Sequence, residues 1–341
     1  MQRLYSLMEV WSKVMEPGAT PPVDVYPWLH WLPQSFFLNW VDRATHVQKE
    51  MNGLYSDFLK GIRQRRLTEG KGRGAFMDRV LDQAESEKKQ DGLTYSDHEL
   101  WFMGGTLTEG GSDTTASIVT AFVQAMVAYP DVQKKAQAQI DSVVGADRSP
   151  TWEDLANLPY IIQCTKEAMR WRPVTPLGFP HALAEDDWVD GKLLPKGTVI
   201  IANLWGLHND PNRYATPQHF NPEHFAGYTK LAPELANGSF EDRDHYGYGL
   251  GRRFCPGAHL AERSLFLTMA KILWAFDITP GEDASGKEVK PDTDPVTGYC
   301  EGFLVCAYDF PATFSVRGEK RKETILREFE EAKSVFAKYE Q

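Results

Sequence analysis

The chain has 341 residues, of which 42% are apolar, and is therefore long enough to bury a substantial hydrophobic core. Its net charge of −10 argues against a nucleic-acid partner, because phosphate binding requires a basic surface. The four cysteines are too few for a disulfide-rich secreted scaffold, and no signal peptide or membrane-spanning apolar run of about 18 residues is evident in the sequence.

The N-terminal third is predicted to be mainly helical. Apolar residues at helical spacing predict helices over three segments, residues 1–15, 41–65 and 76–84. Residues 25–40 carry Trp, Tyr and Phe side chains interrupted by Pro27 and Pro33, and either core packing or contact with a membrane surface explains such a cluster. Residues 68–74 form a charged linker, and residues 85–92 are expected to be a solvated surface.

A longer helix is predicted to begin at Ser96, where Ser96 and Glu99 match a capping box, and to end at Tyr129 before Pro130. Its interior contains four glycines, each costing roughly 1 kcal/mol relative to alanine, at positions Gly104, Gly105, Gly110 and Gly111. Some close neighbour or ligand must therefore need the space. Asp113 and Thr114 follow these glycines, and they either satisfy each other within a weakened helix or form an acid–hydroxyl proton relay.

The rest of the chain combines helices with short strands. Helices are predicted over residues 131–144 and 161–171, with a short one opening at Thr151. Short strands are predicted in the segments 179–183, 188–190 and 198–202, with a turn at Asp190-Gly191. A closing hairpin that would line a substrate pocket is predicted over 302–305 and 313–316, and a surface helix over 317–339. The fold class is therefore mainly α with small β-sheets.

The residues Tyr248 to Gly257, YGLGRRFCPG, place one cysteine inside a glycine-rich loop. The next segment has apolar residues at mostly helical spacing, at Leu260, Leu265, Met269, Ile272 and Leu273. Cys255 therefore lies just before a helix N-terminus. The helix dipole and the adjacent Arg252 and Arg253 favour a thiolate at this position.

Several uses of such a thiolate can be compared. A structural zinc site needs four Cys or His ligands in paired spacings, and only His259 lies near Cys255 in the sequence. A nucleophile needs an oriented base, which one sequence cannot reveal. A merely packed cysteine would not need so many glycines and arginines around it. A heme iron bound by thiolate is the remaining use.

The pattern Tyr248-x-x-Gly251-x-Arg253-x-Cys255-x-Gly257 resembles the heme-binding signature of the cytochrome P-450 family, with Tyr248 where the family usually has Phe. Three further segments resemble family motifs in the expected order. They are Gly110–Thr115, similar to the oxygen-activation motif; Glu167-x-x-Arg170, similar to the Glu-x-x-Arg motif; and Phe220–Phe225, similar to Phe-x-Pro-Glu-Arg-Phe with His224 in place of Arg.

The resemblance implies roles for individual residues. Cys255 would be the axial thiolate and metal ligand of heme b (iron-protoporphyrin IX), held in a loop that includes Tyr248, Gly251 and Gly257. Arg253 and His181 would bind the heme propionates, and Asp113 and Thr114 would form the catalytic proton relay. Glu167, Arg170 and His224 would form a buried structural lock on the cysteine loop. Because a histidine replaces the usual arginine, that lock is expected to be weaker and pH-sensitive.

The resemblance also implies an activity. The chain is expected to be a heme-thiolate monooxygenase that inserts one oxygen atom from O2 into a small apolar organic substrate. Electrons would come from NADPH through NADPH-cytochrome P-450 reductase, docking on the cysteine side near Arg252 and Lys166. The motifs are similar to those of fungal microsomal members that act on secondary metabolites or xenobiotics, which implies the endoplasmic reticulum membrane, although no anchor is seen in this sequence.

The resemblance covers about the C-terminal two-thirds of the family fold. We therefore expect residues 1–341 to form a single cytochrome P-450 domain lacking its N-terminal part, with substrate-access helices in 1–95 and a heme-binding core in 96–341. Two alternatives stay open. One is a catalytically inactive truncated member or incomplete gene product, and the other is a relative that rearranges hydroperoxides without a reductase.

Overall fold

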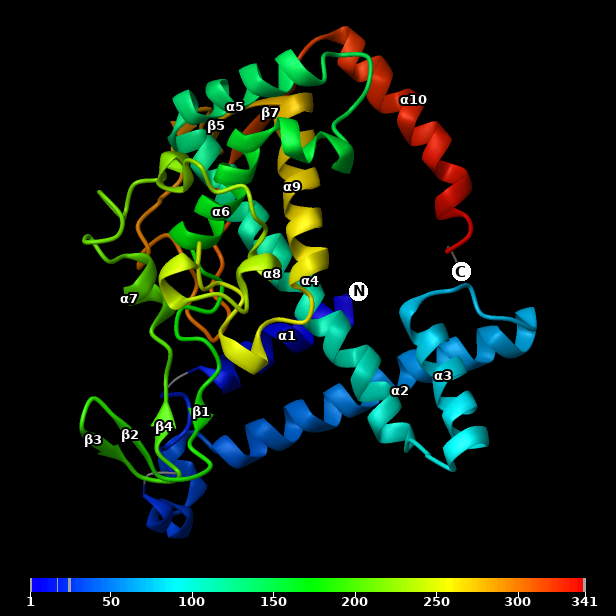
Figure 1. Cartoon of the computed structure of the whole chain (residues 1–341), viewed down its shortest axis with the longest axis vertical. Helices are drawn as coiled ribbons and strands as arrows, with labels where there is room; N and C mark the ends of the chain where they lie inside the picture. The colour runs from blue at the N-terminus through cyan, green and yellow to red at the C-terminus, as the bar shows by residue number, and fades with distance from the viewer. Residues whose placement is uncertain (1, 17, 24–25, 340–341) are drawn as a thin grey trace. The chain divides into compact units, whose positions relative to one another are not determined.

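A computed structural model describes residues 2–16, 18–23 and 26–339 (Figure 1). It divides into two compact units, Met1–Asp113 with Phe329–Gln341, and Thr114–Glu328. Two helices, α4 (Asp97–Ala128) and α10 (Glu319–Phe336), contribute residues to both units. We describe each unit by itself.

The first unit consists of helices. Its elements are α1 (Gln2–Met15), the 3₁₀ turns η1 (Pro27–Trp31) and η2 (Gln34–Phe37), α2 (Trp40–Glu69), α3 (Phe76–Asp91) and the first half of α4. The predicted helices are confirmed, and α1 lies against α2. The segment from residue 85 is exposed as expected but continues α3 as helix, where Lys89 pairs with Glu85 one turn away at 2.9 Å.

The aromatic segment of this unit is largely exposed. Leu29 is buried, whereas Trp31 is 87% exposed and Phe36 is 73% exposed. Core packing within the described chain therefore does not explain this cluster. Among the described helices, none is both long and apolar enough to cross a bilayer.

The start of α4 confirms the predicted capping box. The Ser96 hydroxyl accepts a hydrogen bond from the Glu99 backbone N–H at 3.2 Å, and the Glu99 carboxylate accepts one from the Ser96 N–H at 2.7 Å. The helix ends at Ala128, close to the predicted limit before Pro130.

The glycines of α4 fall into two classes. A Cβ added at Gly105 would lie 2.2 Å from the ring of Tyr55, and one added at Gly104 would lie 2.9 Å from the sulfur of Met77. These two glycines are required for close packing of side chains from α2 and α3. At Gly110 and Gly111 an added Cβ would meet no atom of the described chain within 4 Å, so packing does not require them.

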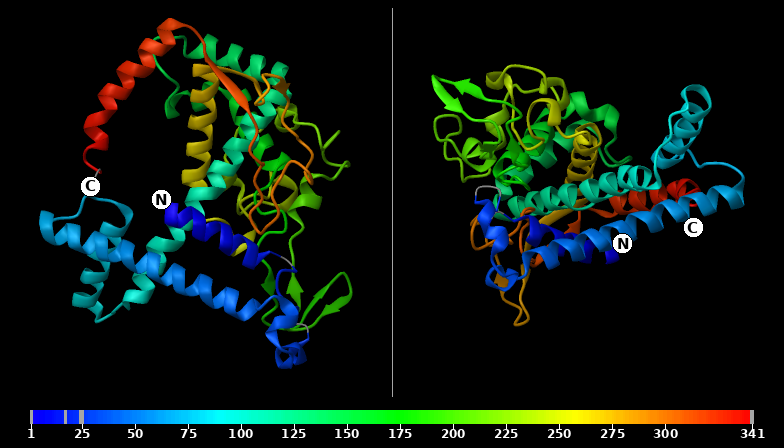
Figure 2. Two further views of the ribbon diagram at one scale, coloured as in Figure 1. Left: turned by 180° about the vertical axis from the view of Figure 1, so that it is seen from behind. Right: turned by 90° about the horizontal axis from the view of Figure 1, so that it is seen from below.

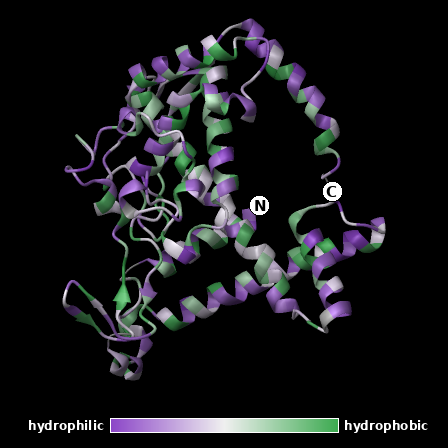
Figure 3. Cartoon of the chain, viewed as in Figure 1, coloured by the Kyte–Doolittle hydropathy of each residue, from purple (hydrophilic) through white to green (hydrophobic). Residues whose placement is uncertain are grey.

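The second unit has the larger core. It is built from the second half of α4, α5 (Pro130–Val143), α6 (Pro159–Trp171) and α9 (Ala258–Ala275), with α9 lying against both α5 and α6. Fully buried side chains include Phe122, Met126, Ile140, Ile161, Trp171, Met269, Leu273 and Trp274. In Figure 3 the ribbons of α2 and α10, whose sequences are rich in charged residues, are mostly in the hydrophilic colours.

One residue of α9 departs from the expected apolar face. Leu260 is 72% exposed, whereas Leu265, Met269 and Leu273 are buried as predicted. The buried polar residue on the core side of the first turn is Glu262, which the apolar pattern did not identify.

Two short sheets follow α6. β1 (His181–Ala182) pairs with β4 (Val199–Ile200), and β2 (Asp187–Val189) pairs with β3 (Lys192–Leu194). The turn between β2 and β3 has left-handed backbone at Asp190 (φ 49°) and Gly191 (φ 74°), which is the conformation of a two-residue hairpin. The predicted Asp-Gly turn is therefore confirmed.

The third sheet corrects the predicted closing hairpin. Its antiparallel order is β6 (Glu288–Val289), β5 (Phe276–Glu282), β7 (Ala312–Val316), and Figure 2 shows β7 beside β5. Ile278 of β5 lies opposite Phe314 of β7, whereas residues 302–305 lie in a loop closed by a bridge between Tyr299 and Ala307. Local alternation indicated a strand at β7 but could not identify its distant partner.

The side of β5 away from β7 is covered by two glutamines of α5. The Gln133 amide accepts a hydrogen bond from Ile278 N–H at 2.8 Å and donates one to the Ile278 carbonyl at 2.8 Å. One turn later, Gln137 donates to the Phe276 carbonyl at 3.0 Å. Side-chain amides therefore occupy the hydrogen-bonding positions of a neighbouring strand.

Short elements connect α6 to α9. They are, besides the strands, α7 (Leu204–His208), η4 (Pro222–Phe225), α8 (Ala232–Leu235), η5 (Phe240–Asp242) and η6 (Gly251–Arg253). Of these, η4 lies against α6 and α8 lies against α9. This arrangement leads the chain from the Glu167–Arg170 helix to the cysteine loop.

Candidate functional site

Cys255 lies in a tight loop between η6 and α9. Its backbone N–H donates to the Tyr248 carbonyl at 2.8 Å, and its carbonyl accepts the N–H of Ala258, the first residue of α9, at 3.3 Å. Gly249 (φ 78°) and Gly251 (φ 58°) have left-handed backbone, which glycine adopts without steric cost. The Cys255 residue is partly exposed and lies just before the N-terminus of α9.

The residues of this loop fit a thiolate-bound cofactor. Among the described residues, the one cluster of His, Cys, Asp and Glu side chains able to hold a metal ion does not include Cys255, so a structural zinc site is not supported. A Cβ added at Gly257 would lie 3.8 Å from the Cys255 sulfur and would contact the thiol directly. The Arg252 and Arg253 side chains are exposed beside it.

Tyr248 occupies the position where the family signature usually has Phe. Its side chain is buried against Phe254, and its hydroxyl has no hydrogen-bond partner in the described structure. Burial, followed by the nearby negative groups Glu262 and Cys255, raises the pKa of this phenol. The Tyr248 ring therefore serves as a packed, neutral aromatic under the loop.

The structure brings Glu167, Arg170 and His224 together. The Arg170 guanidinium donates to both Glu167 carboxylate oxygens, at 2.7 and 2.6 Å, and both side chains are fully buried. His224 Nδ1 lies 3.3 Å from each Glu167 oxygen, and its Nε2 lies 2.8 Å from the Ala215 carbonyl. Both partners are acceptors, so the ring satisfies both only when each nitrogen carries a proton.

A histidine that the sequence interpretation missed links this group to the cysteine loop. Arg170 also donates to the His208 carbonyl at 2.9 Å, and the buried His208 ring accepts the backbone N–H of Tyr246 at 2.8 Å. Burial lowers the pKa of His208 well below its ordinary value, which keeps the ring a neutral acceptor. Tyr246 is two residues before Tyr248, where the loop begins.

A second buried network lies next to the first. Lys166 Nζ is 2.5 Å from an Asp244 oxygen, and both side chains are buried. Lys166 was expected to present positive charge to a redox partner, and this expectation is wrong because its ammonium is enclosed by an ion pair. Spacing could not reveal this, since Asp244 is 78 residues further along the chain.

The acids and the histidine of this network have strongly shifted pKa values. Burial lowers the pKa of His245 to about 4 and raises the pKa of Glu262 to about 7. Burial would also raise the pKa of Asp244, but His245 and Lys166 outweigh it and lower the value to about 2. The Lys166 ammonium already neutralises the Asp244 carboxylate within this network.

The proposed relay residues lie on α4 at the boundary between the units. Asp113 ends the first unit and Thr114 begins the second. Desolvation raises the pKa of Asp113 above its ordinary value, which favours the protonated form that a proton donor needs. Glu109, one turn earlier, has a pKa raised by burial and accepts a hydrogen bond from the Tyr55 hydroxyl. The (i, i+4) spacing could have drawn attention to Glu109.

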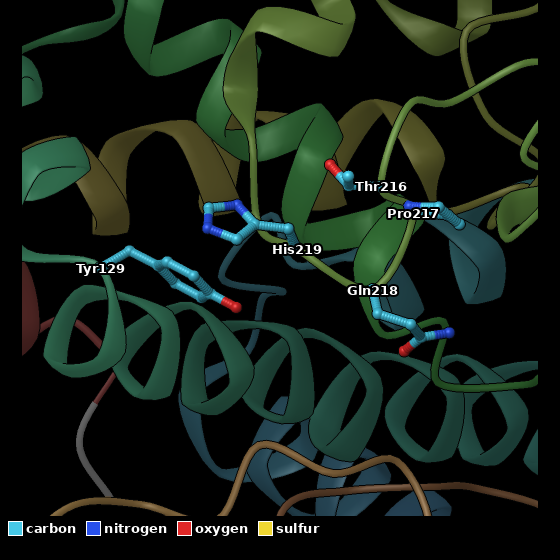
Figure 4. Close-up of a pocket in the computed structure, with 5 residues that line it drawn as sticks. All are labelled: Tyr129, Thr216, Pro217, Gln218 and His219. Carbon is cyan, nitrogen blue, oxygen red and sulfur yellow. The ribbon is translucent and has the colours of Figure 1, made fainter.

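His181 lies in β1 opposite Ile200 and is exposed. The remaining predicted cofactor residues, Arg253, Gly251 and Gly257, share the loop with Cys255. A surface depression of about 430 Å³ lies elsewhere, lined by Tyr129 and residues 216–219 (Figure 4). Its Tyr129 and His219 rings are 4.4 Å apart, and it contains none of the candidate site residues.

Comparison with known proteins identifies the family to which the chain is similar. The sequence model of the family described as cytochrome P450 matches residues 1–296. Cytochrome P450 monooxygenase patH of Aspergillus clavatus is 55% identical over 340 residues, and patH of Penicillium expansum is 53% identical over 340 residues. Cytochrome P450 monooxygenase yanC of Aspergillus niger is 50% identical over 345 residues.

The matches cover 99% of this chain in each case but only 62 to 63% of each relative, so the chain spans less than two-thirds of the length of these curated relatives. They confirm both the resemblance and the mainly helical fold class that the sequence predicted. With the cysteine loop in place before α9, they show that this chain belongs to the cytochrome P450 family, whose members bind heme b through a cysteine thiolate.

Proposed function

We propose that this chain supplies the heme-binding part of a heme-thiolate monooxygenase that inserts one oxygen atom from O2 into an apolar organic substrate. The observation that carries the proposal is the Cys255 loop, which holds a partly exposed thiol at the start of α9 with glycines on either side. The relatives at about half identity are named monooxygenases, which supports the same reaction class.

Cys255 is the proposed axial ligand, and Arg253 and His181 are proposed to bind the propionates, because guanidinium and imidazole groups both donate to carboxylates. Heme b bound by a thiolate supplies the chemistry of O–O cleavage. The proposed contribution of the chain's own side chains is to deliver the protons that O–O cleavage consumes. Asp113 and Thr114 are the proposed relay, and the raised pKa of Asp113 supports its role as donor.

Electrons are proposed to come from NADPH through cytochrome P450 reductase. The cysteine side of the second unit exposes Arg252 in a chain whose net charge is −10. A locally basic surface of this kind suits an acidic redox partner. Lys166 has no part in this surface, because it is buried.

The proposed location is the endoplasmic reticulum membrane. The exposed Trp31, Phe36 and Leu38 side chains support contact with a lipid surface, where Trp and other large apolar residues are favoured. Co-sedimentation of the chain with phospholipid vesicles tests this contact. Loss of binding in a Trp31→Ser, Phe36→Ser double variant supports it, and unchanged binding contradicts it.

The experiment that tests the proposed function is the reduced, carbon monoxide-bound difference spectrum of the chain expressed with heme supplied. The red-shifted Soret band of a thiolate ligand is expected for the wild type and should be absent in Cys255→Ser. If no heme is taken up, or if the band persists in Cys255→Ser, the proposal is overturned. Absence of heme uptake supports the alternative of an inactive member.

A second comparison addresses the other alternative. If the heme-loaded chain turns over substrate only with NADPH and reductase, and if Thr114→Ala lowers that turnover, the monooxygenase reaction is supported. Rearrangement of a hydroperoxide that needs no reductase and is insensitive to Thr114→Ala supports the alternative reaction.

A further inference from the structure

Two cysteines that the proposed function does not use lie side by side in the loop before β7. Cys300 and Cys306 flank the segment 301–305, and their sulfur atoms are 3.0 Å apart. The backbone holds them in register, because Cys300 N–H donates to the Cys306 carbonyl at 2.9 Å and Tyr299 bridges to Ala307. Antiparallel neighbours of this kind bring their Cβ atoms close together.

We propose that Cys300 and Cys306 are a redox site that forms a reversible intramolecular disulfide when the chain meets a peroxide oxidant. A disulfide needs its two Cα atoms within about 7 Å and its side chains directed at each other. Both conditions are met, because the Cys300 backbone N–H donates to the Cys306 carbonyl and the two sulfurs are already in contact. Both side chains are also partly exposed, which gives a small oxidant access.

The surroundings identify Cys300 as the attacking thiol. The Cys306 backbone N–H lies 3.2 Å from the Cys300 sulfur, and the Cys306 side chain adds a second hydrogen bond to it. These contacts, the side-chain one being the larger, lower the pKa of Cys300 to about 6, which favours its thiolate relative to that of an ordinary cysteine. The other partly exposed thiol, Cys255, is the proposed iron ligand, and Cys164 is fully buried with its pKa raised by desolvation.

The reaction with hydrogen peroxide balances in two steps. The Cys300 thiolate attacks one peroxide oxygen, the O–O bond breaks, and with one proton taken up the products are Cys300 sulfenic acid and water. The Cys306 thiol then attacks the Cys300 sulfur, the S–O bond breaks, and a second water leaves as the S–S bond forms. The two sulfurs lose two electrons and the peroxide gains them. A dithiol reductant reverses the change.

A metal-binding role does not fit the Cys300–Cys306 pair. Within the described residues, no third His, Cys, Asp or Glu side chain joins Cys300 and Cys306 in a cluster that could hold a metal ion. Two thiolates alone do not complete the tetrahedral set that zinc requires. The pair therefore has the arrangement of a dithiol rather than of a metal site.

The disulfide would fix a segment that touches the region around β1. Phe303, in the middle of the segment, packs against Phe179 with ring centroids 4.7 Å apart. Val305 N–H donates to the Val174 carbonyl at 2.8 Å. Closing the loop between Cys300 and Cys306 would reduce the freedom of Phe303 to move away from Phe179.

The test uses the full chain and trypsin. The reduced protein is treated with hydrogen peroxide, remaining thiols are blocked with N-ethylmaleimide, and the digest is analysed by mass spectrometry. Because Pro291 protects Lys290, residues 288–317 form one tryptic peptide that contains both cysteines and no other cysteine. We expect the doubly alkylated peptide to be replaced by one that carries no alkyl groups and is two hydrogens lighter than the unmodified dithiol peptide. Reduction with dithiothreitol before alkylation should restore the doubly alkylated form.

Two variants make the result specific. In Cys306→Ser the Cys300–Cys306 disulfide cannot form, and dimedone should capture Cys300 as a sulfenic acid. The control variant Cys164→Ala should leave the yield of the Cys300–Cys306 disulfide unchanged. The proposal is overturned if the peptide stays doubly alkylated, if Cys300 instead pairs with Cys255, or if Cys306→Ser leaves Cys300 unreactive. The measurement needs no heme, so its outcome is independent of the proposed function.

Discussion

The Glu167 side chain is fully buried, and both of its carboxylate oxygens accept hydrogen bonds. Its carboxylate receives the Arg170 guanidinium and the Asn221 backbone N–H, the latter at 2.8 Å, with His224 beside it. A carboxylate this well satisfied can remain charged in the interior. Its removal would leave the Arg170 charge buried without an ionic partner.

Glu167→Ala should therefore lower the free energy of unfolding by about 3–5 kcal/mol, the usual cost of breaking a buried ion pair from one side. Urea denaturation followed by tryptophan fluorescence measures this change. The matched control is Glu85→Ala, which removes an exposed ion pair with Lys89 and should leave the midpoint unchanged within error. Equal effects of the two variants would contradict the buried-lock interpretation.

Glu262 makes stability depend on pH. Burial raises its pKa from the ordinary 4.5 to about 7, so between these values the folded chain binds a proton that the unfolded chain does not. The stabilising contribution is therefore fully present below pH 4.5 and is lost as the pH rises through about 7, with a total of about 3 kcal/mol. His245 acts in the opposite direction, because its pKa is lowered to about 4.

Glu262→Gln should remove this contribution while keeping an oxygen for the Ala232 N–H, which donates to Glu262 at 3.0 Å. Wild type and variant should thus diverge as the pH falls from 7.5 to 5, with the wild type gaining stability relative to the variant. Urea midpoints across that pH range measure the divergence. Parallel curves would show that Glu262 does not titrate in this window, and Glu85→Gln should give parallel curves as the control.

The α4 helix contains two pairs of glycines, and only one pair is required by close packing of neighbouring side chains. Gly104 and Gly105 are needed by Met77 and Tyr55, whereas the backbone at Gly110 and Gly111 faces open space. Two alanine substitutions in one helix should therefore have opposite effects on stability.

Gly105→Ala should destabilise the chain by about 1–3 kcal/mol, because the added Cβ overlaps the Tyr55 ring. Gly110→Ala should stabilise the heme-free chain by up to about 1 kcal/mol through helix propensity. If the helix passes over a flat macrocycle there, Gly110→Ala should at the same time reduce heme uptake, as measured by the Soret absorbance. Normal heme uptake by Gly110→Ala would show that the open space is not used by the cofactor.

The elements that the sequence predicted correctly are those whose signals are local. The Ser96–Glu99 capping box and the Asp190-Gly191 turn each depend on residues within four positions of one another. The partner of β7, the ion pair of Lys166 with Asp244 and the His208 link depend on residues far apart in the chain, and no spacing rule brings them together. The same distinction separates the Cys255 motif, which is contiguous, from the network that supports it.

The chain as a whole is acidic, with a net charge of −10, so the exposed Arg252 near Cys255 provides a local positive charge. Association with a charged redox partner depends on such local fields more than on the total charge. Burial decides which basic residues can contribute, and it excludes Lys166.

Arg252→Glu should raise the KM for the reductase roughly fivefold, the effect of about 1 kcal/mol, with little change in kcat. The effect should shrink at high ionic strength, because salt screens exposed charges. Lys196→Glu, at another exposed basic site between β3 and β4, serves as the control. The same KM increase in both variants would indicate a general charge effect rather than a docking surface.

The glutamines of α5 have a consequence for self-association. An open strand edge is a template on which a second chain can add, and long exposed edges promote aggregation. At β5 that edge is closed by Gln133 and Gln137, whose amides already hold the Ile278 and Phe276 backbone groups. This edge of β5 is therefore protected from pairing with a second chain, because α5 supplies two side-chain amides in the place of a neighbouring strand.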